Sequence, residues 1–222
     1  MKLMYALWGA DLDERLHAAE LRHRLADIGA TEFQINVRDS DVAAAQVKHS
    51  TYEHPIDAIV SVRTRGGHEP VTAALGSVAD EVNGWTVDER TPIIPPRVGN
   101  GERTDALANF ALLRIPDELT RGEWLHRWHD LHTPVAIDTQ DTFGYVQNTV
   151  LEPITPGKRV DALVEELFPM AAMTSAHAFY GAGDDDAELQ RRVTLMMESV
   201  VRFGAHQNLD LVPTSRYVYA LG

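Results

Sequence analysis

The sequence predicts an α+β protein in which the element order strand, helix, strand, strand, helix, strand occurs twice. Two observations predict this class. Segments with an apolar residue at every second position, which is typical of strands, are interleaved with segments of helical periodicity. Between the two series lies "PIIPPRVGNGERT" at 92–104, whose three prolines and two glycines cannot continue a helix or a central strand.

The first series begins with a buried strand at 2–8. Asp11 followed by Glu14 then offers a capping box for a helix that runs to Ile28, where Gly29 stops it. The other predicted elements of this half are strands at 31–38 and 55–65, a helix at 69–82 and a strand at 84–93.

The second series repeats this order. Its predicted elements are a strand at 105–115, a helix at 120–132, strands at 143–151 and 159–168, a helix at 186–202 and a strand at 208–221. In the last helix an apolar stripe at helical spacing predicts a core-facing side; it consists of Leu189, Val193, Met196, Met197, Val200 and Val201.

The two halves contain a similar short sequence at the same place in the element order, since "IDAIV" at 56–60 corresponds to "VDALV" at 160–164. We therefore expect a tandem repeat of two ferredoxin-like βαββαβ units at 1–91 and 105–222, joined by a linker at 92–104. Each unit is an antiparallel sheet with helices on one face, and the bare face needs a partner. We expect the sheets to pair into an α+β barrel, within one chain or between two.

Composition limits the possible partners. The chain has 222 residues and a formal charge of −13, which would repel nucleic acid or an anionic membrane surface. It has no cysteine, and the apolar run before Asp11 is too short for a signal peptide or a membrane span. We expect no nucleic-acid partner, no membrane partner and a cytoplasmic location.

The segment "EWLHRWHDLHTPVA" at 123–136 places three histidines on one helix. At 100° per residue, Trp124, Trp128 and Leu131 fall together, and His132 lies in the same apolar arc. His126 lies on the opposite side, where Asp130 can form a surface pair with it.

The last two histidines leave alternatives open. His129 lies at the boundary of the apolar arc, and His132 lies near the helix end that Pro134 forces or kinks. There His132 either packs against a terminal carbonyl group or reaches a cleft.

No metal site or nucleotide cofactor is predicted. The histidines are three residues apart, no cysteine is available, and Asp130 points away from His132. The glycine-containing stretches "VGNGER" and "RTRGGHE" lack the G-x-G-x-x-G spacing of a dinucleotide-binding loop.

The strand "FGYVQNTV" carries two further candidate site residues. Alternation puts Val146, Asn148 and Val150 on one face, and Tyr145 with Gln147 on the other. Asn148 is a polar residue among valines, which either satisfies a neighbouring backbone group or donates to a substrate oxygen. Tyr145 is either a half-buried strand aromatic or a second donor.

From 107 to 219 the chain resembles the EthD-like family of the dimeric α+β barrel superfamily. The resemblance rests on the helix with its tryptophan, histidine and proline and on "YVQN", "VDALVEELF", "AFYGAG", "RFGAHQNLDL" and "PTSRYV", which follow in the same order. It implies a ferredoxin-like unit paired into a barrel, a homodimer, and a cleft whose histidine is His132 with Trp128 beside it. The N-terminal half lacks the matching tryptophan and proline, so one pocket per chain is expected.

The resemblance implies a cofactor-independent enzyme of lyase, isomerase or oxygenase type that acts on a small apolar or aromatic carbonyl compound. In this hypothesis His132 exchanges a proton, Asn148 or Tyr145 stabilises an oxyanion, and Trp128 with His129 contacts the substrate. The alternatives are a small-ligand-binding or accessory protein of a degradation pathway, and an assembly unit with a filled cleft.

Overall fold

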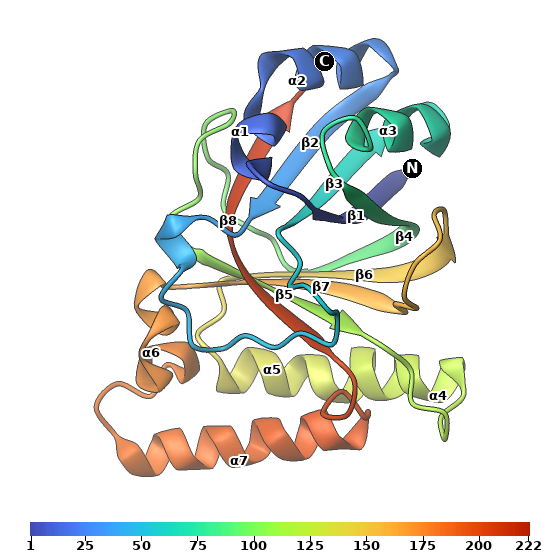
Figure 1. Ribbon diagram of the computed structural model, residues 1–222. Coiled ribbons are helices and arrows are strands. Elements are labelled where there is room, and N and C mark those ends of the chain that lie inside the picture. Colours follow the sequence, from blue (N-terminus) through green and yellow to red (C-terminus); the bar gives the residue numbers. More distant parts are fainter.

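The computed structural model describes residues 1–222 and contains a closed, antiparallel barrel of eight strands (Figure 1). The strands follow one another around the barrel in the order β1-β3-β2-β8-β5-β7-β6-β4. They are β1 (Lys2–Trp8), β2 (Ala30–Val37), β3 (Ala58–Thr64), β4 (Glu81–Ile93), β5 (Leu107–Leu113), β6 (Gly144–Pro153), β7 (Ala162–Phe168) and β8 (Asp210–Ala220).

The barrel closes within one chain. The first four strands lie side by side, as do the last four, and the two sets meet where β2 pairs with β8 and where β4 pairs with β6. Ile35 lies opposite Tyr217 at the first junction, and Val87 lies opposite Val150 at the second. The α+β class and the antiparallel barrel are therefore as expected, and closure no longer requires a second chain.

Helices cover the outside of the barrel in two groups, at the top and the bottom of Figure 1. The upper group is α1 (Leu12–His17), α2 (Ala19–Asp27) and α3 (His68–Leu75). The lower group is α4 (Arg121–His126), a π-helical segment (Arg127–His132), α5 (Thr133–Thr139), α6 (Ala176–Tyr180) and α7 (Asp186–Arg202); two 3₁₀ turns lie at Ser40–Val42 and Met170–Met173.

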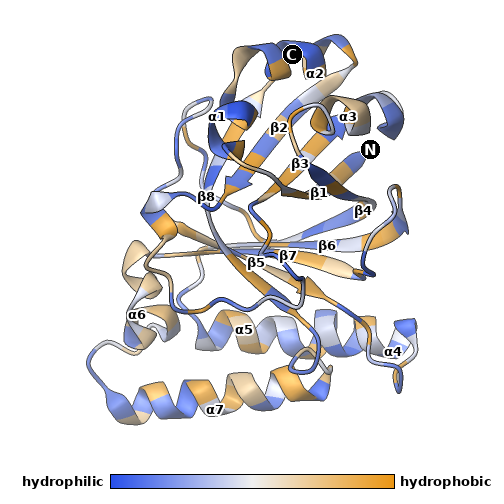
Figure 2. Ribbon diagram, in the orientation of Figure 1, coloured by the Kyte–Doolittle hydropathy of each residue, from blue (hydrophilic) through white to orange (hydrophobic).

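Alternating strand residues divide the apolar core into an interior and two outer layers. Residues such as Met4, Trp85 and Phe110 fill the barrel. Leu3 and its alternating neighbours pack outward against the upper helices, while Trp124 and other residues form the layer under the lower helices. Figure 2 shows the apolar positions along the strands and on α7. The candidate site lies in the lower outer layer.

Two helices of the first half differ from their predicted form. The helix expected from Asp11 to Ile28 is broken at Ala18, whose backbone is extended, and Asp11 makes no side-chain capping bond. The backbone of Asp11 is left-handed, with φ of 53°, so its carboxylate does not reach the amide groups of the first turn. The helix expected at 69–82 ends at Leu75, because the chain must turn at Gly76 to enter β4.

Helix α7 has its predicted bounds, but its apolar stripe is only partly a core. Asp185 caps its first turn by accepting from the N–H groups of Ala187 and Glu188. Met196 packs against the lower outer layer, whereas Met197 and Val201 are 47% and 52% exposed. The interpretation of the whole stripe as core is therefore wrong, because α7 lies over a cavity and contacts the sheet along only part of its face.

None of the helices combines the length and the apolar character needed to cross a membrane.

Candidate functional site

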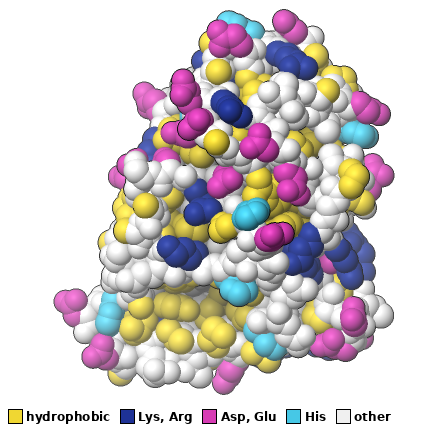
Figure 3. Space-filling model, in the orientation of Figure 1, with side chains coloured by type: hydrophobic (Ala, Val, Ile, Leu, Met, Phe, Trp, Pro, Cys, Tyr) yellow, Lys and Arg dark blue, Asp and Glu magenta, His cyan; other side chains and the backbone are white.

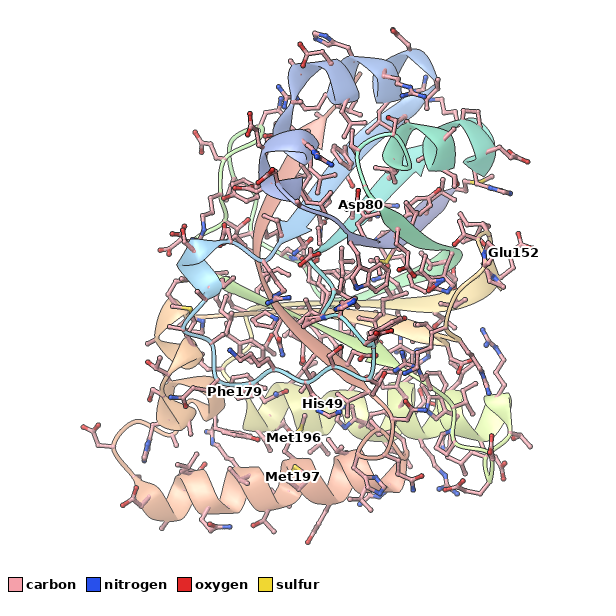
Figure 4. The ribbon with its side chains drawn as sticks, in the orientation of Figure 1. His49, Asp80, Glu152, Phe179, Met196 and Met197 are labelled. Atoms are coloured by element: carbon pink, nitrogen blue, oxygen red, sulfur yellow. The ribbon has the colours of Figure 1, made fainter.

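A cavity of about 420 Å³ lies between the outer face of the second half of the barrel and the lower helices. Figure 3 shows an apolar hollow on this face, and Figure 4 shows Phe179 and Met196 directed into the space between the sheet and α7. Its size suits a small organic molecule, and most of its lining residues are apolar. Apolar lining residues include Ala111, Leu113, Trp128, Val164, Phe179, Met196, Val200 and Phe203.

The helix that carries the histidines does not end at His132. It begins with the capping box of Thr120 and Glu123, widens into a π-helical segment and continues as α5 to Thr139. The wider turn accommodates Pro134, which has no N–H group and whose ring would clash with an α-helical carbonyl group. The hydroxyl of Thr133 donates to the carbonyl oxygen of Trp128 at 3.0 Å.

The π-helical turn changes which side chains face the sheet. Trp124 and Trp128 are fully buried with 5.0 Å between their ring centroids, and His132 is 6% exposed. Leu131, which a regular α-helix would place beside the tryptophans, is 38% exposed. The periodicity therefore placed Leu131 wrongly, because it assumed a constant 100° per residue.

His132 faces the cavity from the helical wall. Its Nδ1 shares a hydrogen bond of 3.0 Å with the hydroxyl of Ser199 on α7, and its ring lies 4.5 Å from that of Phe203, centroid to centroid. Burial lowers the pKa of His132 to about 4, so the ring is neutral near pH 7. Its Nε2 makes no hydrogen bond to the protein and remains free for a ligand. The alternative bond to a terminal carbonyl group is not made.

The other two histidines lie outside the cavity. His126 and Asp130 form the expected exposed pair, with 2.8 Å between Nδ1 and Oδ2. His129 does not line the cavity; its ring lies 4.4 Å from that of Trp128, centroid to centroid, and burial is the main cause of its lowered pKa. The structure contains no group of three or more histidine, cysteine or carboxylate side chains placed to hold a metal ion.

Tyr145 lines the cavity from β6. Its hydroxyl accepts a hydrogen bond of 3.2 Å from the amide of Gln147, which also donates to Thr133 at 2.8 Å. Burial and the nearby carboxyl of Glu166 raise the pKa of Tyr145, so the phenol keeps its proton. Its O–H is therefore available as a donor.

Asn148 does not share the cavity with Tyr145 and His132. As the alternation predicted, it lies on the opposite face of β6, inside the barrel. Its Oδ1 accepts from Nζ of Lys2 at 2.7 Å, and its Nδ2 donates to the carbonyl oxygen of Leu163 at 3.1 Å. The barrel wall separates it from the cavity, and its side chain satisfies neighbouring groups.

The sequence interpretation did not include Glu166, which lies directly opposite Tyr145 on β6 and Asn109 on β5. Burial raises the pKa of Glu166 to about 7, and its Oε1 has no hydrogen-bond partner. The signal was present in "VDALVEELF", where two consecutive glutamates occupy an apolar strand and must therefore point to opposite faces. Only the structure shows that Glu165 has a partner, Arg216, and Glu166 does not.

Comparisons with known proteins identify the fold. No family model matches the sequence, and no curated protein matches it. Among solved structures, an anthrone oxidase-like protein matches with a TM-score of 0.62 at 8% identity, covering 100% of this chain and 93% of that one.

Two candidate monooxygenases have the same arrangement. The one from Lactobacillus acidophilus NCFM has a TM-score of 0.50 at 10% identity, with coverage of 100% of this chain and 96% of that chain. The one from Fusobacterium nucleatum subsp. nucleatum has a TM-score of 0.50 at 6% identity, with coverage of 100% and 94%. This chain therefore shares the overall fold of these three proteins.

Proposed function

We propose that this chain is an EthD-like, cofactor-independent enzyme that moves protons on a small apolar or aromatic carbonyl compound. One observation carries the proposal: a buried, neutral histidine presents a free ring nitrogen to an apolar cavity of ligand size. The names of two structural neighbours refer to an oxidase and a monooxygenase, and such activities are consistent with a ligand of this kind.

In the proposed step, Nε2 of His132 takes a proton from a carbon next to the carbonyl group of the ligand. The C–H bond breaks, its electron pair moves toward the carbonyl oxygen, and an N–H bond forms. Tyr145 donates its O–H to the resulting enolate oxygen, and Trp128 packs against the ligand rings. His129 holds Trp128 in place through the contact between their rings.

The enolate can then take the proton back at another atom, expel a leaving group, or give electrons to dioxygen. These outcomes correspond to an isomerase, a lyase and an oxygenase. A base with a pKa of about 4 is weak in the empty cavity, but the negative charge of the enolate would stabilise the imidazolium ring.

Turnover tests the proposal. Aromatic and polyketide-like carbonyl compounds would be incubated with the wild type, with His132→Ala and with His126→Ala as a surface histidine control, and products followed by mass spectrometry. We expect His132→Ala to lower kcat by about 10²–10⁴-fold and His126→Ala to leave it unchanged. The acid limb of the pH profile is expected near pH 4 instead of near 6.5. Equal turnover by folded His132→Ala and wild type would refute the assignment.

The low pKa of His132 also favours a second candidate function, a protein that binds a small apolar ligand without transforming it. A neutral imidazole can orient a ligand as an acceptor without any proton transfer. Saturable binding with no product from any compound that binds would support this function and contradict the enzyme.

We also propose that the halves at 1–91 and 105–222 are a degenerate tandem repeat of ferredoxin-like units. Asp57 and Asp161, from the two similar segments, are used in the same way: the first accepts from the N–H of Gly9 at 3.1 Å, the second from that of Ile115 at 2.9 Å. The N–H of each aspartate donates to the carbonyl group two residues before that partner. Both halves also have the same internal strand order.

A homodimer remains part of the proposal. The exposed apolar residues Met197 and Val201, which are four positions apart and share one face of α7, support it, because such a surface is suited to contact with a second copy. Light scattering should give about twice the 24.7 kDa of one chain. A mass of one chain at micromolar concentration would contradict it.

A further inference from the structure

Three polar side chains in the cavity make no hydrogen bond to the protein. They are Asn109, Gln140 and Glu166, and in each a buried oxygen lacks a partner. Asn109 is 5% exposed and Gln140 is 7% exposed, so bulk water does not satisfy them. Buried polar groups in proteins are almost always paired, and the exceptions require an explanation.

The three side chains approach the cavity from strands β5 and β7 and from the end of helix α5. Asn109 and Glu166 are cross-strand neighbours on β5 and β7, so they form part of the sheet that floors the cavity. Gln140 directly follows α5. His132 and its partner Ser199 lie on the helical wall. The polar groups therefore occupy the floor and one end of a cavity whose remaining lining is mainly apolar.

Leaving these groups unpaired destabilises the fold, and apolar residues of similar size would remove that penalty. A ligand that carries hydrogen-bond donors would remove it as well. An ionised carboxylate can only accept hydrogen bonds, so Glu166 requires a donor. The amide groups of Asn109 and Gln140 can present either their oxygen or their nitrogen.

We propose that the cavity recognises an apolar, ring-containing ligand through its hydroxyl groups, with Glu166 and Asn109 on the sheet as the main acceptors and Gln140 as a third contact. The inference rests on the proposed function, because it concerns the same cavity, and it defines the ligand as a hydroxylated compound. A hydroxyl group fits better than an ammonium group, since the cavity offers a cation only one carboxyl group and otherwise apolar or neutral surface.

Direct binding to matched probes tests this inference without any need for turnover. Calorimetry would compare 2-naphthol, 2-methoxynaphthalene and 2-naphthylmethylammonium, which share one ring system and differ in the polar group. For the wild type at pH 8 we expect 2-naphthol to bind about tenfold or more tightly than the methyl ether. The ammonium probe is expected to bind more weakly than 2-naphthol.

Variants assign the preference to the proposed residues. Glu166→Leu and Asn109→Ala should each reduce the preference for the hydroxyl group, and Glu166→Gln should reduce it less than Glu166→Leu because an amide oxygen still accepts. Glu118→Gln, at an exposed position, is the matched control and should leave it unchanged. Circular dichroism would establish that each variant is folded, and Glu166→Leu should fold well because it removes a buried, unpaired carboxyl group.

The preference should also depend on pH. Glu166 titrates near pH 7, and a protonated carboxyl group can donate to the ether oxygen, so the preference should shrink between pH 8 and pH 5.5. Tyr145 on β6, Tyr180 on α6, His132 and His206 are the other titratable groups that line the cavity. The pKa of His132 lies below this range, and those of the two tyrosines are raised above their usual range. His206→Gln should therefore retain the pH effect, whereas Glu166→Gln should lose it.

Several results would overturn the inference: equal binding of 2-naphthol and its ether, tighter binding of the ammonium probe, no binding of any probe, or a hydroxyl preference that Glu166→Leu retains. None of these concerns His132, so loss of turnover in His132→Ala would still support the enzyme. Conversely, a hydroxyl preference that depends on Glu166, combined with full turnover in His132→Ala, would refute only the proposed chemistry.

Discussion

Arg216 on β8 forms an ion pair with Glu165 on β7 inside the barrel, with 3.1 Å between Nε and Oε1. The pair crosses β5, which lies between the two strands, and amide groups of Gln34 and Asn36 also donate to the same carboxylate. Both charged side chains are almost fully enclosed. The pair lies within the second half of the chain, and the amide contacts of Gln34 and Asn36 on β2 link the first half to it through the barrel interior.

Removing one member of this pair should leave an uncompensated charge. We expect Glu165→Leu or Arg216→Met to lower the free energy of unfolding by about 3–5 kcal/mol. The double variant should lose less than the sum of the single losses, because neither charge remains. Urea unfolding followed by circular dichroism gives the three values; strictly additive losses would show that the two side chains do not interact.

His132 should make stability depend on pH. Its folded pKa of about 4 lies below the usual histidine value of 6.5, so the unfolded chain binds the proton first as the pH falls. The free energy of unfolding should therefore decrease between pH 6.5 and pH 4, by up to about 3 kcal/mol. His132→Gln should lack this decrease. Thermal unfolding across the range, compared with His126→Gln, would reveal it, and parallel curves for His132→Gln and wild type would contradict it.

Glu166 should have the opposite effect. Its folded pKa of about 7 lies above the usual glutamate value of 4.5, so the unfolded chain releases the proton first as the pH rises. Stability should decrease between pH 4.5 and pH 7 by about 1–2 kcal/mol, a value reduced from the full shift because part of the side chain borders the cavity. Glu166→Gln should be more stable than wild type at pH 8. A lower stability at that pH would mean that the ionised carboxyl has a partner.

Asp57 and Asp161, which occupy corresponding positions in the two similar segments, should contribute differently to the free energy of unfolding. Asp161 is buried, whereas the side chain of Asp57 is 42% exposed. We expect Asp161→Ala to cost about 1–3 kcal/mol of unfolding free energy and Asp57→Ala less than about 1 kcal/mol, because water can replace the lost partner at the exposed site. Chemical denaturation would measure both. A larger loss at Asp57 would mean that exposure does not set the cost.

The sequence by itself determined the local features of this protein. Alternation at every second residue predicted the strands, and on β6 it separated Asn148 from Tyr145 correctly. The apolar arc of the 123–136 helix placed Trp124, Trp128 and His132 in a buried layer. These features depend on residues close together in the chain, so a short window contains the information.

Only the tertiary structure decided the features that depend on distant residues. Closure within one chain requires β2 to meet β8 and β4 to meet β6, across long separations. The π-helical turn depends on how Pro134 is accommodated, and it moved Leu131 out of the buried layer. Glu165 and Glu166 are adjacent and chemically identical, yet one faces Arg216 in the barrel and the other an apolar cavity. Their environments, and hence their charges, are set by partners that the ring of strands brings together.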